Sequence, residues 1–139
     1  MFTKTMVRTL SALHTHVYRL VGGAGPVNRH TLILTTRGRK TGRDVSTPLL
    51  YVSESGRYYI VASFGGSDRP PGWYLNLVNN PEVTIEVGRS KRRCRARSLT
   101  PEEATPIWPQ LLAIWPAYET YQKRTTRVIP VVELTPIEG

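Results

Sequence analysis

A loop with four cations and two glycines is the segment best suited to bind a charged ligand, and it covers residues 37–43. Backbone amides and cationic side chains in such a loop can converge on an anion, which makes it a candidate phosphate site. The hydroxyls of Ser46 and Thr47, just downstream, could bind the same ligand. The pattern is not a Walker loop, so a solvated basic hairpin turn stays open as the alternative. The cations are Arg37, Arg39, Lys40 and Arg43.

Two further segments could frame a flat ring. Residues 61–66 end a predicted strand in small residues and glycines, which lets a ring approach the backbone closely, although a plain strand and flexible loop would look the same. Trp73, Tyr74 and Asn76 offer an aromatic wall and an amide for a polar ligand edge. Core packing is the alternative role for Trp73.

Three aromatic residues follow near the end of the chain at the spacing i, i+3, i+6. In helical geometry Trp115, Tyr118 and Tyr121 would form one aromatic ridge, either in a core or on a binding surface. A last charged run, residues 91–97, alternates so that its arginines at 93, 95 and 97 share one strand face opposite Cys94 and Ala96. That face is solvated or contacts acidic lipid or a polyanion.

The length and composition favour one globular domain. The chain has 139 residues, of which 40% are hydrophobic and 21% charged, so it can bury a core and is not of a disordered type. The net charge of +9 favours anionic partners, without choosing among nucleic acid, membrane and phosphorylated ligand. No helix-turn-helix, zinc-finger or RNA-recognition signature is present, so we expect no nucleic-acid partner.

Several other classes are disfavoured by what the sequence lacks. One cysteine cannot form an internal disulfide, and no apolar run reaches the length of a membrane span, so a cytoplasmic location is expected. His14, His16 and His30 have no carboxylate or thiol cluster beside them, so no metal is expected. A Ser-His-Asp hydrolase has no recognisable nucleophile elbow here.

Two regions of different pattern must position these residues. Residues 1–25 are predicted to form a basic amphipathic helix, with apolar positions recurring every three or four residues from 5 to 20. This helix could pack on its own domain or lie peripherally on the anionic cytoplasmic membrane face.

Residues 26–139 change to short β-branched and aromatic runs joined by turn residues, which predicts antiparallel strands. Proline at the start and Asn-Pro at the end mark a helix over residues 71–81, and a second helix is predicted over 101–114. The predicted strands are residues 31–36, 47–52, 58–63, 83–87, 92–98 and 128–134.

An ordered set of short motifs resembles the deazaflavin (F420)-dependent nitroreductase and quinone reductase family. Each motif is weak alone, but their order is specific and covers roughly residues 30–134. The motifs are Gly-Arg-Lys-Thr-Gly at 38–42, Thr-Pro-Leu at 47–49, Ala-Ser-Phe-Gly-Gly at 62–66, Trp-Tyr-Leu-Asn-Leu at 73–77, Asn-Pro-Glu-Val at 80–83, and Tyr-Gln-x-Arg-Thr-x-Arg-x-x-Pro at 121–130.

The resemblance implies a mostly β fold, a split β-barrel of the flavin-reductase or FMN-binding type with flanking helices. It also implies coenzyme F420, whose deazaflavin ring carries a phosphodiester and a polyglutamate tail, as the ligand of residues 26–139. Arg39, Lys40, Thr41 and Arg43 would hold the phosphate or tail, and Val45, Ser46, Thr47, Pro48, Leu49 and Leu50 would lie along the cofactor. Val61, Ala62, Ser63, Phe64, Gly72, Trp73, Tyr74, Leu75 and Asn76 would frame the ring.

The same resemblance implies hydride transfer from the reduced deazaflavin to a quinone, menaquinone-like, or to a nitro or enone acceptor. Ser63, Tyr118 and Tyr121 would act near the acceptor, with Tyr118 first as the group that hydrogen-bonds or protonates the oxygen gaining charge. Trp115 stands where a third tyrosine can occur, which shifts the expectation from nitro drugs to quinones. Trp115, Tyr118 and Tyr121 would contact the acceptor. A non-catalytic barrel that binds F420 or a lipid is the alternative, and the sequence does not set the oligomeric state.

Overall fold

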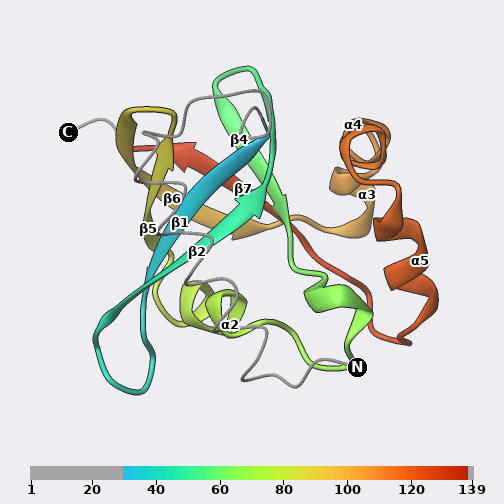
Figure 1. Ribbon diagram of the computed structural model, residues 1–139, viewed down its shortest axis with the longest axis horizontal. Helices are drawn as coiled ribbons and strands as arrows, with labels where there is room; N and C mark the ends of the chain where they lie inside the picture. The colour runs from blue at the N-terminus through green and yellow to red at the C-terminus, as the bar shows by residue number, and fades with distance from the viewer. Residues whose placement is uncertain (1–29, 138–139) are drawn as a thin grey trace.

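Seven antiparallel strands form one sheet in the computed structural model, which describes residues 30–137 (Figure 1). In space they follow the order β2-β1-β5-β6-β7-β4-β3. The helix predicted over residues 5–20 lies outside the described residues. The strands are β1 (Thr31–Arg37), β2 (Asp44–Leu50), β3 (Val52–Glu54), β4 (Arg57–Val61), β5 (Glu82–Val87), β6 (Ser90–Ser98) and β7 (Val131–Pro136).

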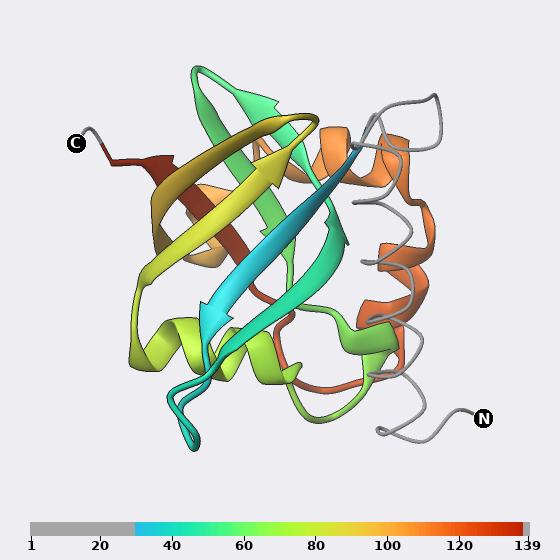
Figure 2. The same ribbon diagram turned by 60° about the vertical axis from the view of Figure 1, so that its left-hand side comes forward.

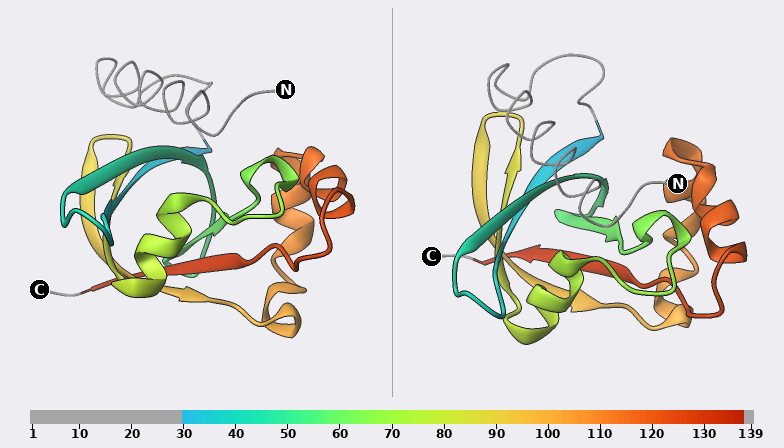
Figure 3. Two further views of the ribbon diagram at one scale, coloured as in Figure 1. Left: turned by 90° about the horizontal axis from the view of Figure 1, so that it is seen from below. Right: turned by 60° about the horizontal axis from the view of Figure 1, so that its bottom comes forward.

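The connection between β2 and β3 requires this sheet to curl. The two strands lie at opposite ends of the sheet order, yet only Tyr51 separates them along the chain. A flat sheet of this size would hold its ends roughly 29 Å apart, and one residue spans about 3.5 Å. The sheet therefore closes on itself, with β2 in contact with β4, and Figure 3 shows the resulting ring of strands. The predicted mostly β fold, a split β-barrel flanked by helices, is confirmed.

The inside of the barrel holds one hydrophobic core. Alternate residues of the strands point inward, so that Cys94 and Ala96 are buried while Arg93, Arg95 and Arg97 are exposed on the outer face, as the alternation predicts. The largest inward side chains are Leu32, Leu34, Ile60, Ile85, Val132 and Leu134, all fully buried.

Helix α2 (Gly72–Asn79) crosses one opening of the barrel (Figures 2 and 3). Pro71 precedes its first turn, where a missing N–H costs nothing, and Asn80 ends it. Trp73 and Leu77 project from it into the barrel core, with 7% and 3% of their surface exposed. The predicted helix at 71–81 is confirmed to within two residues, and it covers this opening of the barrel.

A second core lies between the outer faces of β4 and β7 and three helices (Figure 1): α3 (Pro101–Ala104), α4 (Trp108–Ile114) and α5 (Ala117–Lys123). Helix α3 begins with a capping box, in which the Thr100 hydroxyl accepts from the Glu103 N–H at 3.2 Å and the Glu103 carboxylate accepts from the Thr100 N–H at 2.9 Å. The prediction of one helix over 101–114 was wrong. A turn at residues 105–107, which contains Pro106, separates α3 from α4, and Pro109 lies in the first turn of α4.

Two strand predictions also need correction. The strand predicted at residues 47–52 is the end of β2 and the start of β3, so the sheet has one strand more than the six predicted. The strand predicted from residue 128 begins at Val131, because residues 127–130 form a loop in which the Val128 side chain is 67% exposed.

Candidate functional site

The basic loop between β1 and β2 has a tightly fixed backbone. The Gly38 N–H donates to the Arg43 carbonyl at 2.7 Å, and the Gly42 N–H donates to the Gly38 carbonyl at 2.8 Å. A Cβ on Gly38 would lie 2.9 Å from the Arg43 carbonyl oxygen, and Gly42 has φ +73°, which disfavours other residues. The Thr41 hydroxyl accepts from the Arg43 N–H at 3.2 Å. Both glycines are therefore required by the loop's own geometry.

Asn76 fastens this loop to helix α2. Its side-chain oxygen accepts from the Arg39 backbone N–H at 3.2 Å and from the Arg39 guanidinium at 2.9 Å. Its amide group donates to the Thr36 hydroxyl at 3.1 Å. The same guanidinium reaches the Gly72 carbonyl at 3.4 Å. These bonds join the end of β1, the basic loop and α2. They are shielded from solvent, because Asn76 and Thr36 are 4% and 1% exposed.

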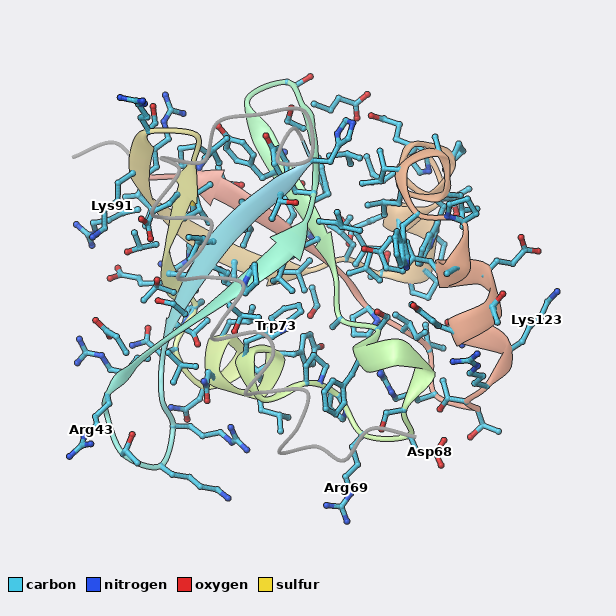
Figure 4. The ribbon with its side chains drawn as sticks, viewed as in Figure 1. Arg43, Asp68, Arg69, Trp73, Lys91 and Lys123 are labelled. Carbon is cyan, nitrogen blue, oxygen red and sulfur yellow. The ribbon has the colours of Figure 1, made fainter. Side chains whose placement is uncertain are left out.

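Three cations of the loop remain available to a ligand. These are Arg37, Lys40 and Arg43, which are exposed and take part in no ion pair within residues 30–137. Figure 4 shows Arg43 at the outer part of this loop, directed away from the barrel. Arg39 is half-buried and already bound to α2, so its role combines holding the loop and presenting positive charge.

Strand β2 leads from the loop along one margin of the barrel seam, which is the line where the two ends of the curled sheet meet. As a terminal strand of the sheet it pairs with β1 alone, and its Ser46 hydroxyl shares a hydrogen bond of 2.8 Å with that of Thr35. Val45 is 42% exposed, whereas the five residues after it are half-buried. The structure thus places the six predicted cofactor contacts, Val45, Ser46, Thr47, Pro48, Leu49 and Leu50, along this margin.

The end of β4 and the short 3-10 helix η2 (Phe64–Gly66) lie close to α5. Ser63 stands between them and is 8% exposed, and Val61 and Ala62 are buried. Phe64 and Gly66 have φ +45° and +80°, so the chain turns sharply here. A Cβ on Gly66 would lie 2.6 Å from the Tyr121 carbonyl oxygen. Only glycine allows the predicted ring-framing segment to touch α5 this closely.

The side chain of Arg127 holds the backbone of residues 62–67 in place. Its guanidinium donates to the carbonyls of Ser67 at 2.8 Å, Ala62 at 3.2 Å and Ser63 at 2.9 Å. Its remaining nitrogen, Nη1, is the one buried side-chain polar atom of the described residues without a hydrogen-bond partner. Burial lowers the pKa of Arg127, although the group stays charged at neutral pH. The sequence showed this arginine only as part of a motif, because its acceptors lie some 60 residues away.

The three aromatic residues meet, but not as one helical ridge. Trp115 follows the end of α4, and Pro116 separates it from α5, which carries Tyr118 and Tyr121. The Trp115 indole N–H donates to the Tyr121 hydroxyl at 3.3 Å, and the two tyrosine rings are 6.2 Å apart, edge to face. Burial raises the pKa of Tyr118, so its phenol stays protonated across the physiological range and can donate a hydrogen bond.

The remaining predicted contacts fall on α2. Gly72, Leu75 and Tyr74 are half-buried, and the Tyr74 hydroxyl shares a hydrogen bond of 2.8 Å with that of Ser98. The Trp73 ring packs in the barrel core, so it stabilises α2 beneath the site and presents little surface to solvent. In residues 30–137 no group of three or more His, Cys, Asp or Glu side chains could hold a metal, and no helix there could span a membrane.

Comparison with known proteins gives one family. Residues 10–136 match the family model described as F420H(2)-dependent quinone reductase. An F420H(2)-dependent quinone reductase of Mycobacterium tuberculosis (strain ATCC 25618 / H37Rv) is 38% identical over 138 residues, which cover 91% of this chain and 89% of the relative.

Two solved structures are similar in sequence and fold. An F420-H2 dependent reductase has 37% identity and a TM-score of 0.70, over 76% of this chain and 94% of its own. A chain described as a domain-swapped dimer has 31% identity and a TM-score of 0.72, over 91% of this chain and 98% of its own.

Proposed function

Because the chain belongs to the F420H(2)-dependent quinone reductase family, we propose that it transfers a hydride from reduced coenzyme F420 to a quinone. The observation that carries the proposal is the basic loop fastened by Asn76 to α2, next to the free margin of β2. Exposed cations thus lie at one end of the seam. There they could bind the anionic tail of a cofactor whose flat ring lies along β2.

The donor set fits this cofactor. Lys40 and Arg43 offer charge to a phosphate or carboxylate, and the half-buried residues of β2 offer a surface of mixed polarity along the ring. The unpartnered Nη1 of Arg127 belongs to the guanidinium that holds the backbone at Ala62 and Ser63. A polar ring edge bound there would satisfy this buried donor.

When bound, reduced F420 supplies a hydride as a two-electron donor. The protein then has to orient the two reactants, exclude water and stabilise the acceptor oxygen as it gains charge. Ser63, just before η2, and Tyr118, on α5, are buried residues that carry hydroxyl groups, and η2 packs against α5. Each can therefore donate a hydrogen bond in an environment of low dielectric constant. Tyr118, kept neutral by burial, is the group we assign first to hydrogen-bond the acceptor oxygen.

Anaerobic oxidation of reduced F420 with menadione tests this function. Lys40→Ala should weaken F420 binding by roughly tenfold through loss of a charge-assisted contact. Lys91→Ala is the matched control, since Lys91 is also an exposed lysine but lies on β6, outside the basic loop. Tyr118→Phe should lower kcat while leaving F420 affinity unchanged.

Three results would each contradict a different part of the proposal. Binding of FMN without measurable affinity for F420 would contradict the cofactor. Tight F420 binding without reduction of any quinone would favour a non-catalytic binding protein. Reduction of nitro compounds but of no quinone would retain the enzyme and cofactor and reject the acceptor.

A further inference from the structure

A cavity of about 250 Å³ lies between the helices α3, α4 and α5 and strand β7. Residues of α3, α4 and α5 and of the loop that leads into β7 form its walls. Leu99, Ala104, Trp108, Leu112 and Val128 supply apolar walls, and the Tyr118 ring forms part of the lining.

The size of the cavity restricts what it can hold. Pockets for whole drug-sized ligands measure roughly 300–1,000 Å³, so this space suits a portion of a ligand and not a tricyclic cofactor with its side chain. Its lining is mainly apolar, so the fitting portion is a hydrocarbon chain.

The charge of the lining selects further among hydrocarbon chains. Glu119 is the one charged residue among the lining residues, and it is exposed on the first turn of α5. A carboxylate headgroup at this mouth would be repelled, whereas an uncharged chain would not. An uncharged hydrocarbon chain therefore fits better than a fatty acid.

Tyr118 connects this cavity with the proposed acceptor position. Its ring is edge to face with Trp108, in the cavity wall, at 6.4 Å and with Tyr121 at 6.2 Å. A ligand whose polar ring lies beside the two tyrosines could extend a chain past Tyr118 into the cavity. We propose that the cavity receives the prenyl tail of the quinone, an inference that rests on the proposed quinone reductase function.

Comparison of a quinone with and without a tail tests the inference. Wild-type protein should reduce a naphthoquinone carrying two isoprene units with a kcat/KM at least about tenfold above that for menadione, because burial of two or three chain carbons suffices for this factor. Val128→Asp adds a charge at the cavity and should abolish that preference while leaving menadione reduction unchanged. Val78→Asp is the control, since Val78 is 61% exposed on α2 and Val128 is 67% exposed.

Direct binding of farnesol, a neutral tail without a quinone, separates this inference from the function. Farnesol binding that Val128→Asp weakens supports the cavity even if no quinone is reduced, a result that would overturn the function alone. Reduction of both quinones with equal kcat/KM, or an unchanged preference in Val128→Asp, would overturn the cavity assignment alone. Palmitate binding more tightly than farnesol would also overturn it, because the occupant would then be a fatty acid.

Discussion

Replacing Asn76 with leucine tests the link between the barrel, the basic loop and α2. Leucine has nearly the same size but cannot bond to Arg39 or Thr36. Thr36 is 1% exposed, so loss of the partner of its hydroxyl should cost about 1–3 kcal/mol, whereas the half-buried Arg39 can return to water at a cost of about 1 kcal/mol. We expect the free energy of unfolding to fall by about 3 kcal/mol in total.

Urea denaturation followed by far-UV circular dichroism measures this loss. With a slope of about 2 kcal/mol/M, the midpoint should fall by roughly 1.5 M. Asn79→Leu is the matched control, because Asn79 is exposed on the same helix and its substitution should change stability by no more than about 0.5 kcal/mol.

The same variant also separates stability from function. Under conditions where Asn76→Leu is folded, the released basic loop should bind F420 roughly tenfold more weakly, because the loop must be ordered again on binding. A loss of stability equal to that of Asn79→Leu, with unchanged F420 affinity, would refute the reasoning from these hydrogen bonds.

Three further predictions concern other parts of the structure. Gly66→Ala should lower the melting temperature more than Gly65→Ala, because both have positive φ but only a Cβ on Gly66 meets the backbone of α5; equal losses would contradict the close contact. Burial raises the pKa of Cys94 to about 11, so Ellman's reagent should label it at pH 8 only after unfolding. Because this pKa exceeds the unfolded value of about 8.5, the stability it contributes is complete below pH 8.5 and is lost toward pH 11, a slope that Cys94→Ala should remove. Arg127→Met should speed amide exchange in residues 62–67, and unchanged exchange would show that its carbonyl contacts are dispensable.

The elements with strong local patterns were predicted well. Strands predicted at 83–87 and 92–98 correspond to β5 and β6 within two residues, because one face of each is buried and the other solvated. The helix at 71–81 carried its own proline and Asn-Pro boundaries and matches α2. In such segments the burial pattern repeats along the chain, so a local rule suffices.

The passage from β2 to β3 could not be predicted in this way. Residues 47–52 read as one continuous strand, and no glycine marks the point at which the chain changes from one end of the sheet to the other. That change depends on which strands pair far away in the sequence. The break between α3 and α4 was missed for a different reason, since prolines were visible at 106 and 109 but their effect on the helix was underestimated.

The same distinction between local patterns and long-range contacts applies to the candidate site. The cations of the basic loop were visible as residue types, whereas the Asn76 bonds to Arg39 and Thr36 span 37 and 40 positions of sequence. The contact of Gly66 with α5 and the carbonyl contacts of Arg127 likewise join segments that local patterns cannot relate. Residue chemistry was therefore predictable, and the tertiary contacts that orient it were not.

The one-residue connection at Tyr51 determines where the barrel can open. At that end of the seam the chain itself bridges β2 and β3, and the Tyr51 N–H is bonded to the His30 carbonyl at 2.7 Å. At the other end β2 continues into the basic loop, which is held to α2 by hydrogen bonds of the Asn76 and Arg39 side chains. Thermal fluctuations of the seam should thus increase steadily from Tyr51 toward α2, as for a hinge fixed at one edge. A ligand that enters between the margins would have its access route at the positively charged end.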